Sequence, residues 1–216
     1  MKTLIVTGGN INEDFLLEVI NKEKFETIIA VDNGLSILNE NKIKPNYIVG
    51  DFDTVDTKIL DEYKNDKSVE IHEYNPIKDN TDTDIAIKLA IELKSEKIII
   101  LGATGTRLDH VLGNIQVLKQ AMDNNIECKL LDENNEIQLI NRTTILNKKE
   151  LTKKYISLIP LTESVENINL KGFKYELRNG TLTIGSSLGI SNEIVAEQAI
   201  IEFNNGILIM IMSKDA

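Results

Sequence analysis

Up to residue 131, short runs of β-branched apolar residues alternate with segments of helical spacing. The apolar runs lie at residues 3–6, 27–31, 47–49, 69–72, 97–101 and 128–131. Apolar positions recur with helical spacing over residues 85–93 and again over residues 108–122. Strands that alternate with helices indicate βαβ units. This part of the chain is therefore predicted to form a mostly parallel sheet with helices on both faces.

The pattern changes after residue 134, where convincing helices end. Strand-like runs lie at residues 155–159, 165–170, 174–177, 181–184 and 200–203. Asn179-Gly180 and Asn205-Gly206 each separate two apolar runs, and each predicts a hairpin because this dipeptide favours a type I′ turn. We predict an α/β domain over residues 1–133 and an antiparallel β-sandwich over residues 134–216. The junction at residues 132–136 is polar.

Charge and cysteine content narrow the class of protein. The formal net charge of −10 disfavours nucleic acid and anionic membranes as partners, since both are negatively charged. Cys128 is the single cysteine, which excludes a disulfide within the chain and fits a cytoplasmic location. The first apolar run is too short for a signal peptide and breaks at Gly8-Gly9.

Polar and acidic segments follow the predicted strands, where an open parallel sheet binds its ligands. These segments are Gly8-Gly9-Asn10, Asp32-Asn33-Gly34, Gly50-Asp51-Phe52-Asp53, and residues 78–84 and 102–110. Asp51, Asp53 and Asp82 would bring several negative charges to one crevice, which a divalent cation would offset. Oxygen ligands favour Mg²⁺ over zinc, and Mg²⁺ held by carboxylates usually accompanies phosphates. The sequence therefore predicts a magnesium and phosphate site.

Several of these residues also have ordinary structural explanations. Thr81-x-x-Asp84 matches a capping box at the start of a helix. Asp32 could belong to a simple turn. For Arg107 we favour a role as a phosphate clamp, with a surface salt bridge to Asp109 as the alternative. For His110, at the start of a helix, we favour a supporting role over that of a general base.

Taken together, the motifs resemble those of one enzyme family. The segments that carry the resemblance are Asp32-Asn33-Gly34, Gly50-Asp51-Phe52-Asp53, Lys78-Asp79-x-Thr81-Asp82-x-Asp84, Gly102-x-x-Gly105-x-Arg107-x-Asp109-His110-x-x-x-Asn114 and Ser191-Asn192-Glu193. In this order, over nearly the whole chain, they resemble thiamine pyrophosphokinase, especially its bacterial branch. The resemblance implies transfer of the pyrophosphoryl group of ATP to the hydroxyethyl oxygen of thiamine, giving thiamine diphosphate and AMP. It also implies Mg²⁺, an α/β domain followed by a β-sandwich, and a homodimer whose site is shared between subunits.

The resemblance also implies roles for individual residues. Asp51, Asp53 and Asp82 would hold the metal and triphosphate and, with Arg107, would carry the catalysis. Residues expected to contact ATP or thiamine are Asp32, Asn33, Lys78, Thr81, Gly102, Thr104, Arg107, Asp109, His110, Ser191 and Asn192. Ser191 and Asn192 would lie at the aminopyrimidine end of thiamine. The chain departs from family members that stack thiamine on tryptophan, because it contains none.

Two alternative functions remain at this point. A related pyrophosphokinase acting on a hydroxymethyl pterin uses a similar catalytic fold, but it has no need of a sandwich domain carrying Ser191 and Asn192. A non-catalytic sensor of nucleotide or thiamine would be expected to lose the metal-binding aspartates, and this chain keeps them.

Overall fold

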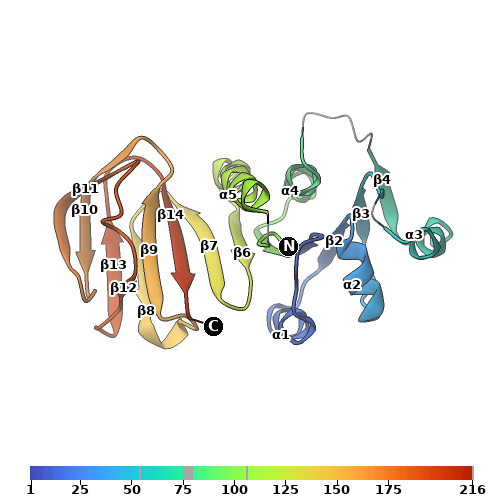
Figure 1. Ribbon diagram of the computed structural model, residues 1–216, viewed down its shortest axis with the longest axis horizontal. Coiled ribbons are helices and arrows are strands. Elements are labelled where there is room, and N and C mark those ends of the chain that lie inside the picture. Colours follow the sequence, from blue (N-terminus) through green and yellow to red (C-terminus); the bar gives the residue numbers. More distant parts are fainter. Residues whose placement is uncertain (54, 75–79, 106, 216) are drawn as a thin grey trace. The chain divides into compact units, whose positions relative to one another are not determined.

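The protein is described here from a computed structural model that covers residues 1–53, 55–74, 80–105 and 107–215. The chain divides into two compact units, Met1–Glu133 and Asn134–Ala216. Figure 1 shows helices and strands in the first unit and mainly strands in the second. Lys78, which the sequence places in the site, lies outside the described residues.

The first unit is built on a parallel sheet with the strand order β6-β5-β1-β2-β3-β4. Its strands are β1 Lys2–Val6, β2 Thr27–Val31, β3 Tyr47–Gly50, β4 Glu70–Glu73, β5 Lys97–Leu101 and β6 Glu127–Leu131. All six lie within one residue of the predicted runs. Ile98, Ile99 and Ile100 are at most 1% exposed, as expected of a central strand covered on both faces.

Among the described residues of this unit, five helices connect the strands and cover the two faces of the sheet. They are α1 Glu13–Glu23, α2 Gly34–Glu40, α3 Thr57–Lys64, α4 Asp82–Glu92 and α5 Leu108–Asp123. Figure 1 shows α4 and α5 on one side of the sheet, opposite α1 and α2. Leu16, Leu35 and Leu60, from α1, α2 and α3, pack in one core with Leu4 and Ile48 of the sheet. The predicted α/β class is confirmed.

Local signals fix where several helices begin. The side chain of Asn12 accepts a hydrogen bond from the Phe15 N–H at 3.0 Å. Helix α1 begins at Glu13, the residue after Asn12. Asp56 caps α3 in the same way through the Lys58 N–H. These caps satisfy N–H groups that have no partner within the helix itself.

The second unit is a sandwich of two antiparallel sheets. One has the order β12-β9-β14-β7 and the other β11-β10-β13-β8. The strands are β7 Asn135–Ile140, β8 Thr144–Asn147, β9 Tyr155–Pro160, β10 Ser164–Lys171, β11 Leu177–Thr183, β12 Asn192–Glu193, β13 Gln198–Glu202 and β14 Leu208–Ser213, with a short 3₁₀ turn at Lys148–Glu150. Ile156 and Met210 of the first sheet share a core with Ile168 and Ile201 of the second. The predicted sandwich is confirmed.

Both predicted hairpins are wrong. Asn179-Gly180 lies inside β11, which pairs with β10 through register shifts, and Asn179 has a φ of 51°. The left-handed conformation that was expected to turn the chain instead forms an irregularity within a continuous strand. Asn205-Gly206 separates β13 from β14, but these strands belong to different sheets, so this turn carries the chain across the sandwich.

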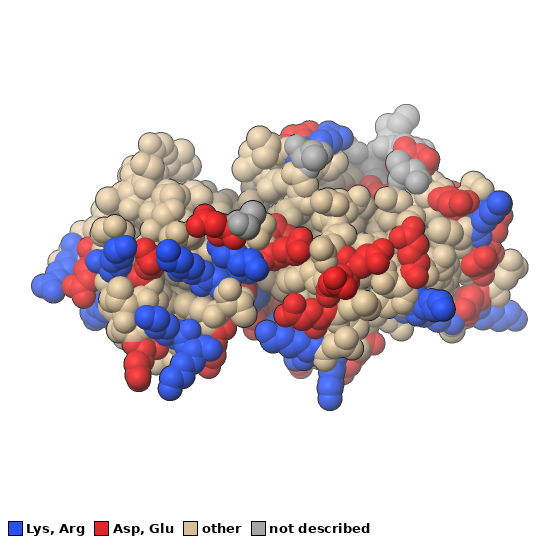
Figure 2. Space-filling model, turned by 60° about the horizontal axis from the view of Figure 1, so that its bottom comes forward, with Lys and Arg blue, Asp and Glu red and all other residues tan. Residues whose placement is uncertain are grey.

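Charged groups of both signs cover the surface. Figure 2 shows acidic and basic side chains interspersed over one face of the molecule. Several form exposed ion pairs, such as Lys174–Glu193 at 2.8 Å and Lys171–Glu202 at 2.8 Å. Pairs of this kind contribute little to stability. Within the described residues, no helix has the length and apolar character required to cross a bilayer.

Candidate functional site

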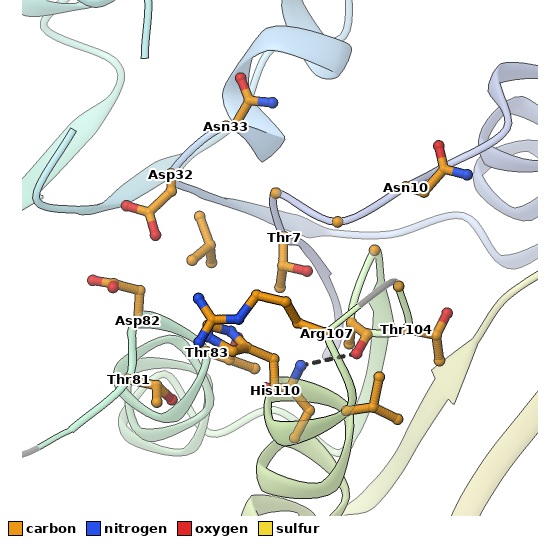
Figure 3. Close-up of a pocket in the computed structure, with 18 residues that line it drawn as sticks. Thr7, Asn10, Asp32, Asn33, Thr81, Asp82, Thr83, Thr104, Arg107 and His110 are labelled. Atoms are coloured by element: carbon orange, nitrogen blue, oxygen red, sulfur yellow. Dashed lines mark hydrogen bonds between the residues drawn. The ribbon is translucent and has the colours of Figure 1, made fainter. Parts of the chain in front are cut away.

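A pocket of about 680 Å³ opens beyond the carboxyl ends of β1, β2 and β5, beside the first residues of α4 and α5 (Figure 3). It is lined by Thr7, Gly8, Gly9, Asn10, Val31, Asp32, Asn33, Thr81, Asp82, Thr83, Gly102, Ala103, Thr104, Gly105, Arg107, His110, Val111 and Asn114. The chain after β1 leads to α1 on one face, and the chain after neighbouring β5 leads to α5 on the other. The pocket therefore lies at the topological switch of the sheet, where this architecture binds ligands.

The loops after β1 and β5 touch at the pocket through their backbones. A Cβ atom on Gly9 would lie 2.0 Å from the carbonyl oxygen of Gly102. Any side chain at residue 9 would therefore force the two loops apart. Glycine at this position lets the backbone of both loops form the pocket wall, where N–H groups can approach a phosphate.

Asp32, the residue after β2, has a left-handed conformation with a φ of 46°. Its N–H donates to the carbonyl of Val49 at 3.0 Å, which ties it to the next strand. A Cβ atom on Gly50 would lie 1.9 Å from Oδ1 of Asp32, so the carboxylate rests directly against Gly50, the residue before Asp51. Such backbone conformations are uncommon outside glycine and cluster at functional sites.

The start of α4 forms a second wall of the pocket. Thr81 caps this helix, because its Oγ1 accepts the N–H of Asp84 at 3.3 Å. Asp82, the first residue of the helix, lines the pocket. Figure 3 shows its carboxylate on the same side of the pocket as that of Asp32. The capping interpretation of Thr81 and its position at the site are therefore compatible.

Arg107 reaches the pocket and is paired with Asp109. Its Nε and Nη2 donate to the two carboxylate oxygens of Asp109 at 3.3 and 2.7 Å, which is the salt bridge that the sequence left open. Hydrogen bonding from Arg107 lowers the pKa of Asp109 to about 2, and the same bond raises the pKa of Arg107. Arg107 lines the pocket, as Figure 3 shows, whereas Asp109 does not.

The loop after β5 is held by α5. Asn114 is 8% exposed, and its Nδ2 donates to the carbonyl oxygen of Ala103 at 2.9 Å. This bond fixes the segment that carries Gly102 and Thr104, both predicted site residues. His110, one turn before Asn114 on the same helix, is exposed and lines the pocket.

Asp51 and Asp53 are not among the residues that line this pocket. Phe52 between them has a φ of 60° and is 8% exposed, packed in the core. Asp51 Oδ1 accepts the N–H of Asp53 at 3.2 Å. Across the described residues, no group of three or more His, Cys, Asp and Glu is close enough to hold a metal ion. The predicted trio of Asp51, Asp53 and Asp82 thus does not form a ready-made metal cage.

The residues present nevertheless fit a hard divalent cation. Mg²⁺ takes oxygen ligands, keeps several water molecules and commonly needs only one or two carboxylates together with substrate phosphates. Asp82 and Asp32 provide carboxylates at the pocket, and Asp51 follows the glycine on which Asp32 rests. The donor set is entirely oxygen, which is unsuited to a site for a soft metal.

The second unit holds the two remaining predicted residues. Ser191 is exposed in a left-handed conformation with a φ of 58°, and its N–H donates to Ser157 Oγ at 3.0 Å. Asn192 is 8% exposed. Its Oδ1 accepts the Tyr175 N–H at 3.0 Å, and its Nδ2 donates to the Tyr175 carbonyl at 2.8 Å. Asn192 therefore fixes the backbone of Tyr175. Tyr175 itself is 62% exposed.

The residues expected from the sequence to contact ligand leave out several that line the pocket, including Thr7, Asn10, Thr83 and Val111. Asn10 had a signal, since it follows two glycines at the end of a predicted strand. No local pattern indicates Thr83, which lies between Asp82 and Asp84. Its position on the helix turns it toward the pocket while Asp84 turns toward α5.

Comparisons with known proteins agree with this architecture. Residues 19–130 match the family model "Thiamin pyrophosphokinase, catalytic domain", and residues 142–208 match "Thiamin pyrophosphokinase, vitamin B1 binding domain". A Bacillus subtilis protein named thiamine pyrophosphokinase is 38% identical over 218 residues, covering 100% of both chains. A Caenorhabditis elegans protein named thiamin pyrophosphokinase 1 is 26% identical, covering 88% of this chain and 80% of its own.

Solved structures give the same result. The crystal structure of thiamine pyrophosphokinase from Bacillus subtilis superposes with a TM-score of 0.89 at 37% identity, covering 100% of both chains. That of thiamin pyrophosphokinase from Geobacillus thermodenitrificans gives a TM-score of 0.86 at 31% identity, covering 100% of this chain and 99% of the other. With both family models matched in order and full-length relatives in sequence and structure, the chain belongs to the thiamine pyrophosphokinase family.

Proposed function

We propose that the protein is a thiamine diphosphokinase, which transfers the pyrophosphoryl group of ATP to the hydroxyethyl oxygen of thiamine and releases AMP. The observation that carries this proposal is the pocket at the switch of the sheet, in a chain that matches the family over both of its units. Residues 1–133 would form the catalytic domain, and residues 134–216 would form the thiamine-binding domain.

The reaction is proposed to be an in-line displacement, in which the thiamine hydroxyl attacks the β-phosphorus of ATP. Phosphoryl chemistry depends mainly on positioning and on neutralising charge. Arg107 can leave Asp109 and clamp a phosphate in its place, because both partners are exposed. The loops at residues 8–10 and 102–105 offer backbone groups to the polyphosphate, and His110 and Thr81 border it.

We propose Mg²⁺ as the ion, held by Asp82 with Asp51 and Asp53, and with Asp32 beside them. When bound, it would neutralise charge on the polyphosphate and orient it. The proposed ligands are all carboxylates, and this oxygen donor set supports the choice. Ser191 is proposed to contact the aminopyrimidine end of thiamine. Asn192 is proposed to act there indirectly, through its two hydrogen bonds to the backbone of Tyr175.

The decisive experiment incubates the purified protein with ATP, Mg²⁺ and thiamine, and measures AMP and thiamine diphosphate together. Equal amounts of both products are expected, with none after chelation and recovery when Mg²⁺ is restored. A parallel reaction replaces thiamine with a hydroxymethyl pterin. AMP formed only with the pterin would replace the proposal with that alternative, and tight binding of thiamine and ATP without AMP would identify a sensor.

We further propose a homodimer with a site shared between subunits and a cytoplasmic location. Leu108 and Leu112, four residues apart on α5, are 73% and 62% exposed, as expected of a surface covered in an assembly. Sedimentation equilibrium tests the dimer. Mixing inactive Asp82→Asn and Ser191→Ala subunits tests the shared site, since only a shared site regains activity in the mixture.

The proposed cytoplasmic location rests on the single buried cysteine and is tested by cell fractionation.

A further inference from the structure

One buried carboxylate joins the two helices whose first turns border the pocket. Asp84 of α4 is 8% exposed. Its Oδ1 accepts a hydrogen bond from Nε2 of Gln120, on α5, at 2.6 Å. Lys88, one turn later in α4, places its Nζ 3.2 Å from the same oxygen. None of these three residues is among the described residues that line the pocket.

The helices that this bond connects carry different parts of the site. The first turn of α4 supplies Thr81, Asp82 and Thr83, while α5 and the residue before it supply Arg107 and His110. A shift of α4 along α5 would therefore move the carboxylate of Asp82 relative to the guanidinium of Arg107. Small changes in the relative position of reacting groups are costly in catalysis.

Asp84 also organises the start of its own helix. Its backbone N–H donates to Oγ1 of Thr81 at 3.3 Å, and Lys88, its ion-pair partner, donates to Oδ1 of Asn80 at 3.2 Å. Asp84 thus ties together the segment that enters α4, the first turn of α4 and the neighbouring helix. An apolar residue could fill the space between the helices, but it would not fix their register by a directional bond.

We propose that Asp84 is a positioning residue for the transfer reaction, which it serves by holding the start of α4 against α5 through Gln120. This inference rests on the proposed function, because the geometry at stake is that of the polyphosphate between Asp82 and Arg107. Asp84 acts through these residues and does not itself touch the substrate.

The test compares Asp84→Ala, Gln120→Ala and the double variant with the conservative Asp84→Asn. Asp123→Asn is the matched control, because the Lys119–Asp123 pair at 2.7 Å is an exposed (i, i+4) pair on α5. All are assayed well below their melting temperatures for kcat, for the KM values of ATP and thiamine, and for the Mg²⁺ concentration that gives half activation.

Both alanine variants are expected to lower kcat/KM for ATP by about tenfold to a hundredfold and to raise the Mg²⁺ requirement, with KM for thiamine unchanged. The double variant should be no worse than either single variant, because each substitution removes the same hydrogen bond between Asp84 and Gln120. Asp84→Asn should recover much of the loss, since its Oδ1 can still accept from Gln120. Asp123→Asn should behave as wild type.

Alanine variants that melt earlier but keep wild-type kinetics would overturn the inference, as would additive losses in the double variant. If the wild-type protein itself makes no AMP, the proposed function fails. The positioning role of Asp84 is then tested separately, by measuring the affinity of the wild type and the variants for Mg²⁺-ADP by calorimetry. Weaker nucleotide binding in Gln120→Ala and Asp84→Ala supports positioning of the pocket, and unchanged binding in both refutes it.

Discussion

The guanidinium of Arg107 holds the carboxylate of Asp109 at 2.7 Å, yet only Arg107 lines the pocket. The side chains are 67% and 66% exposed, so water screens the attraction and the pair contributes little to stability. A pair of this kind keeps Arg107 extended while leaving it available to a more highly charged partner. A polyphosphate is such a partner.

The protonation of Asp109 should report on this exchange. Because Arg107 lowers the pKa of Asp109 from 3.8 to about 2, the pair is present above the ordinary carboxyl pKa and is lost as pH falls through about 2. Arg107→Ala should return the pKa toward 3.8, as should ATP if it draws Arg107 away. Carbon-detected NMR of the carboxyl group measures this shift. A midpoint that stays near 2 in the variant would contradict the assignment.

Arg107→Lys should retain the charge but lose bidentate recognition of phosphate. We expect kcat/KM for ATP to fall by about 10²-fold, with less effect on KM for thiamine. Steady-state kinetics with each substrate varied in turn checks this. Arg178→Lys, which alters an exposed pair with Glu176 in the second unit, is the control and should change neither constant. Equal losses in both variants would remove the special role of Arg107.

The carboxylates proposed for the metal can be ranked by substitution. Asp82→Asn and Asp51→Asn should each lower kcat by about 10²- to 10³-fold and raise the Mg²⁺ requirement, because each would remove a charge from the proposed metal site. Asp53→Asn tests the third member. Asp61→Asn, on the surface of α3, is the control. Unchanged turnover and unchanged Mg²⁺ demand in Asp51→Asn would restrict the metal site to the carboxylates that line the pocket.

Gly9 and Gly113 should respond to alanine in opposite ways. At Gly9 the new Cβ would lie 2.0 Å from a backbone oxygen, so we expect a loss of about 1–3 kcal/mol in the free energy of unfolding, together with weaker ATP binding. At Gly113, inside α5, nothing lies within 4 Å, and alanine should stabilise the helix by about 0.5–1 kcal/mol. Urea denaturation of both variants measures the difference. A neutral Gly9→Ala would show that the two loops can separate.

Asn192→Ala should remove both hydrogen bonds that hold the backbone of Tyr175. We expect a loss of about 1–3 kcal/mol in stability and a higher KM for thiamine with KM for ATP unchanged. Asn205→Ala is the control, because Asn205 makes a single exposed bond of 3.4 Å to the backbone of Glu166. A stability loss without any change in KM for thiamine would limit Asn192 to a structural role.

The sequence predicts the parallel sheet well because its strands are short, β-branched and bounded by polar turns. The prediction fails at Asn179-Gly180. A left-handed residue such as Asn179 is compatible both with a hairpin turn and with an irregularity inside a strand. The outcome depends on the pairing of β11 with β10 along its length, which is a tertiary interaction. Residues 135–140 form β7 although the stretch begins as a polar junction, since β14 pairs with it.

For the site, the sequence locates the correct loops but not the direction of every side chain. Asp32, Asp82, Arg107 and His110 line the pocket as strand ends and helix starts suggest. The carboxylates on either side of Phe52 depend on a left-handed φ of 60° at a buried aromatic residue, which no local pattern signals. Thr83 could be placed only once the rotation of α4 was known.

Strand β1 pairs with β5 inside the sheet, and the loops after both strands line the pocket. The pocket needs the loop that begins at Thr7 and the helix residue Asn114, so a chain growing from its N-terminus has no nucleotide site until both are in place. Joining such distant segments is a slow step in assembling a parallel sheet. Nucleotide binding should therefore report that these segments have come together, and a bound nucleotide should delay the unfolding of the first unit.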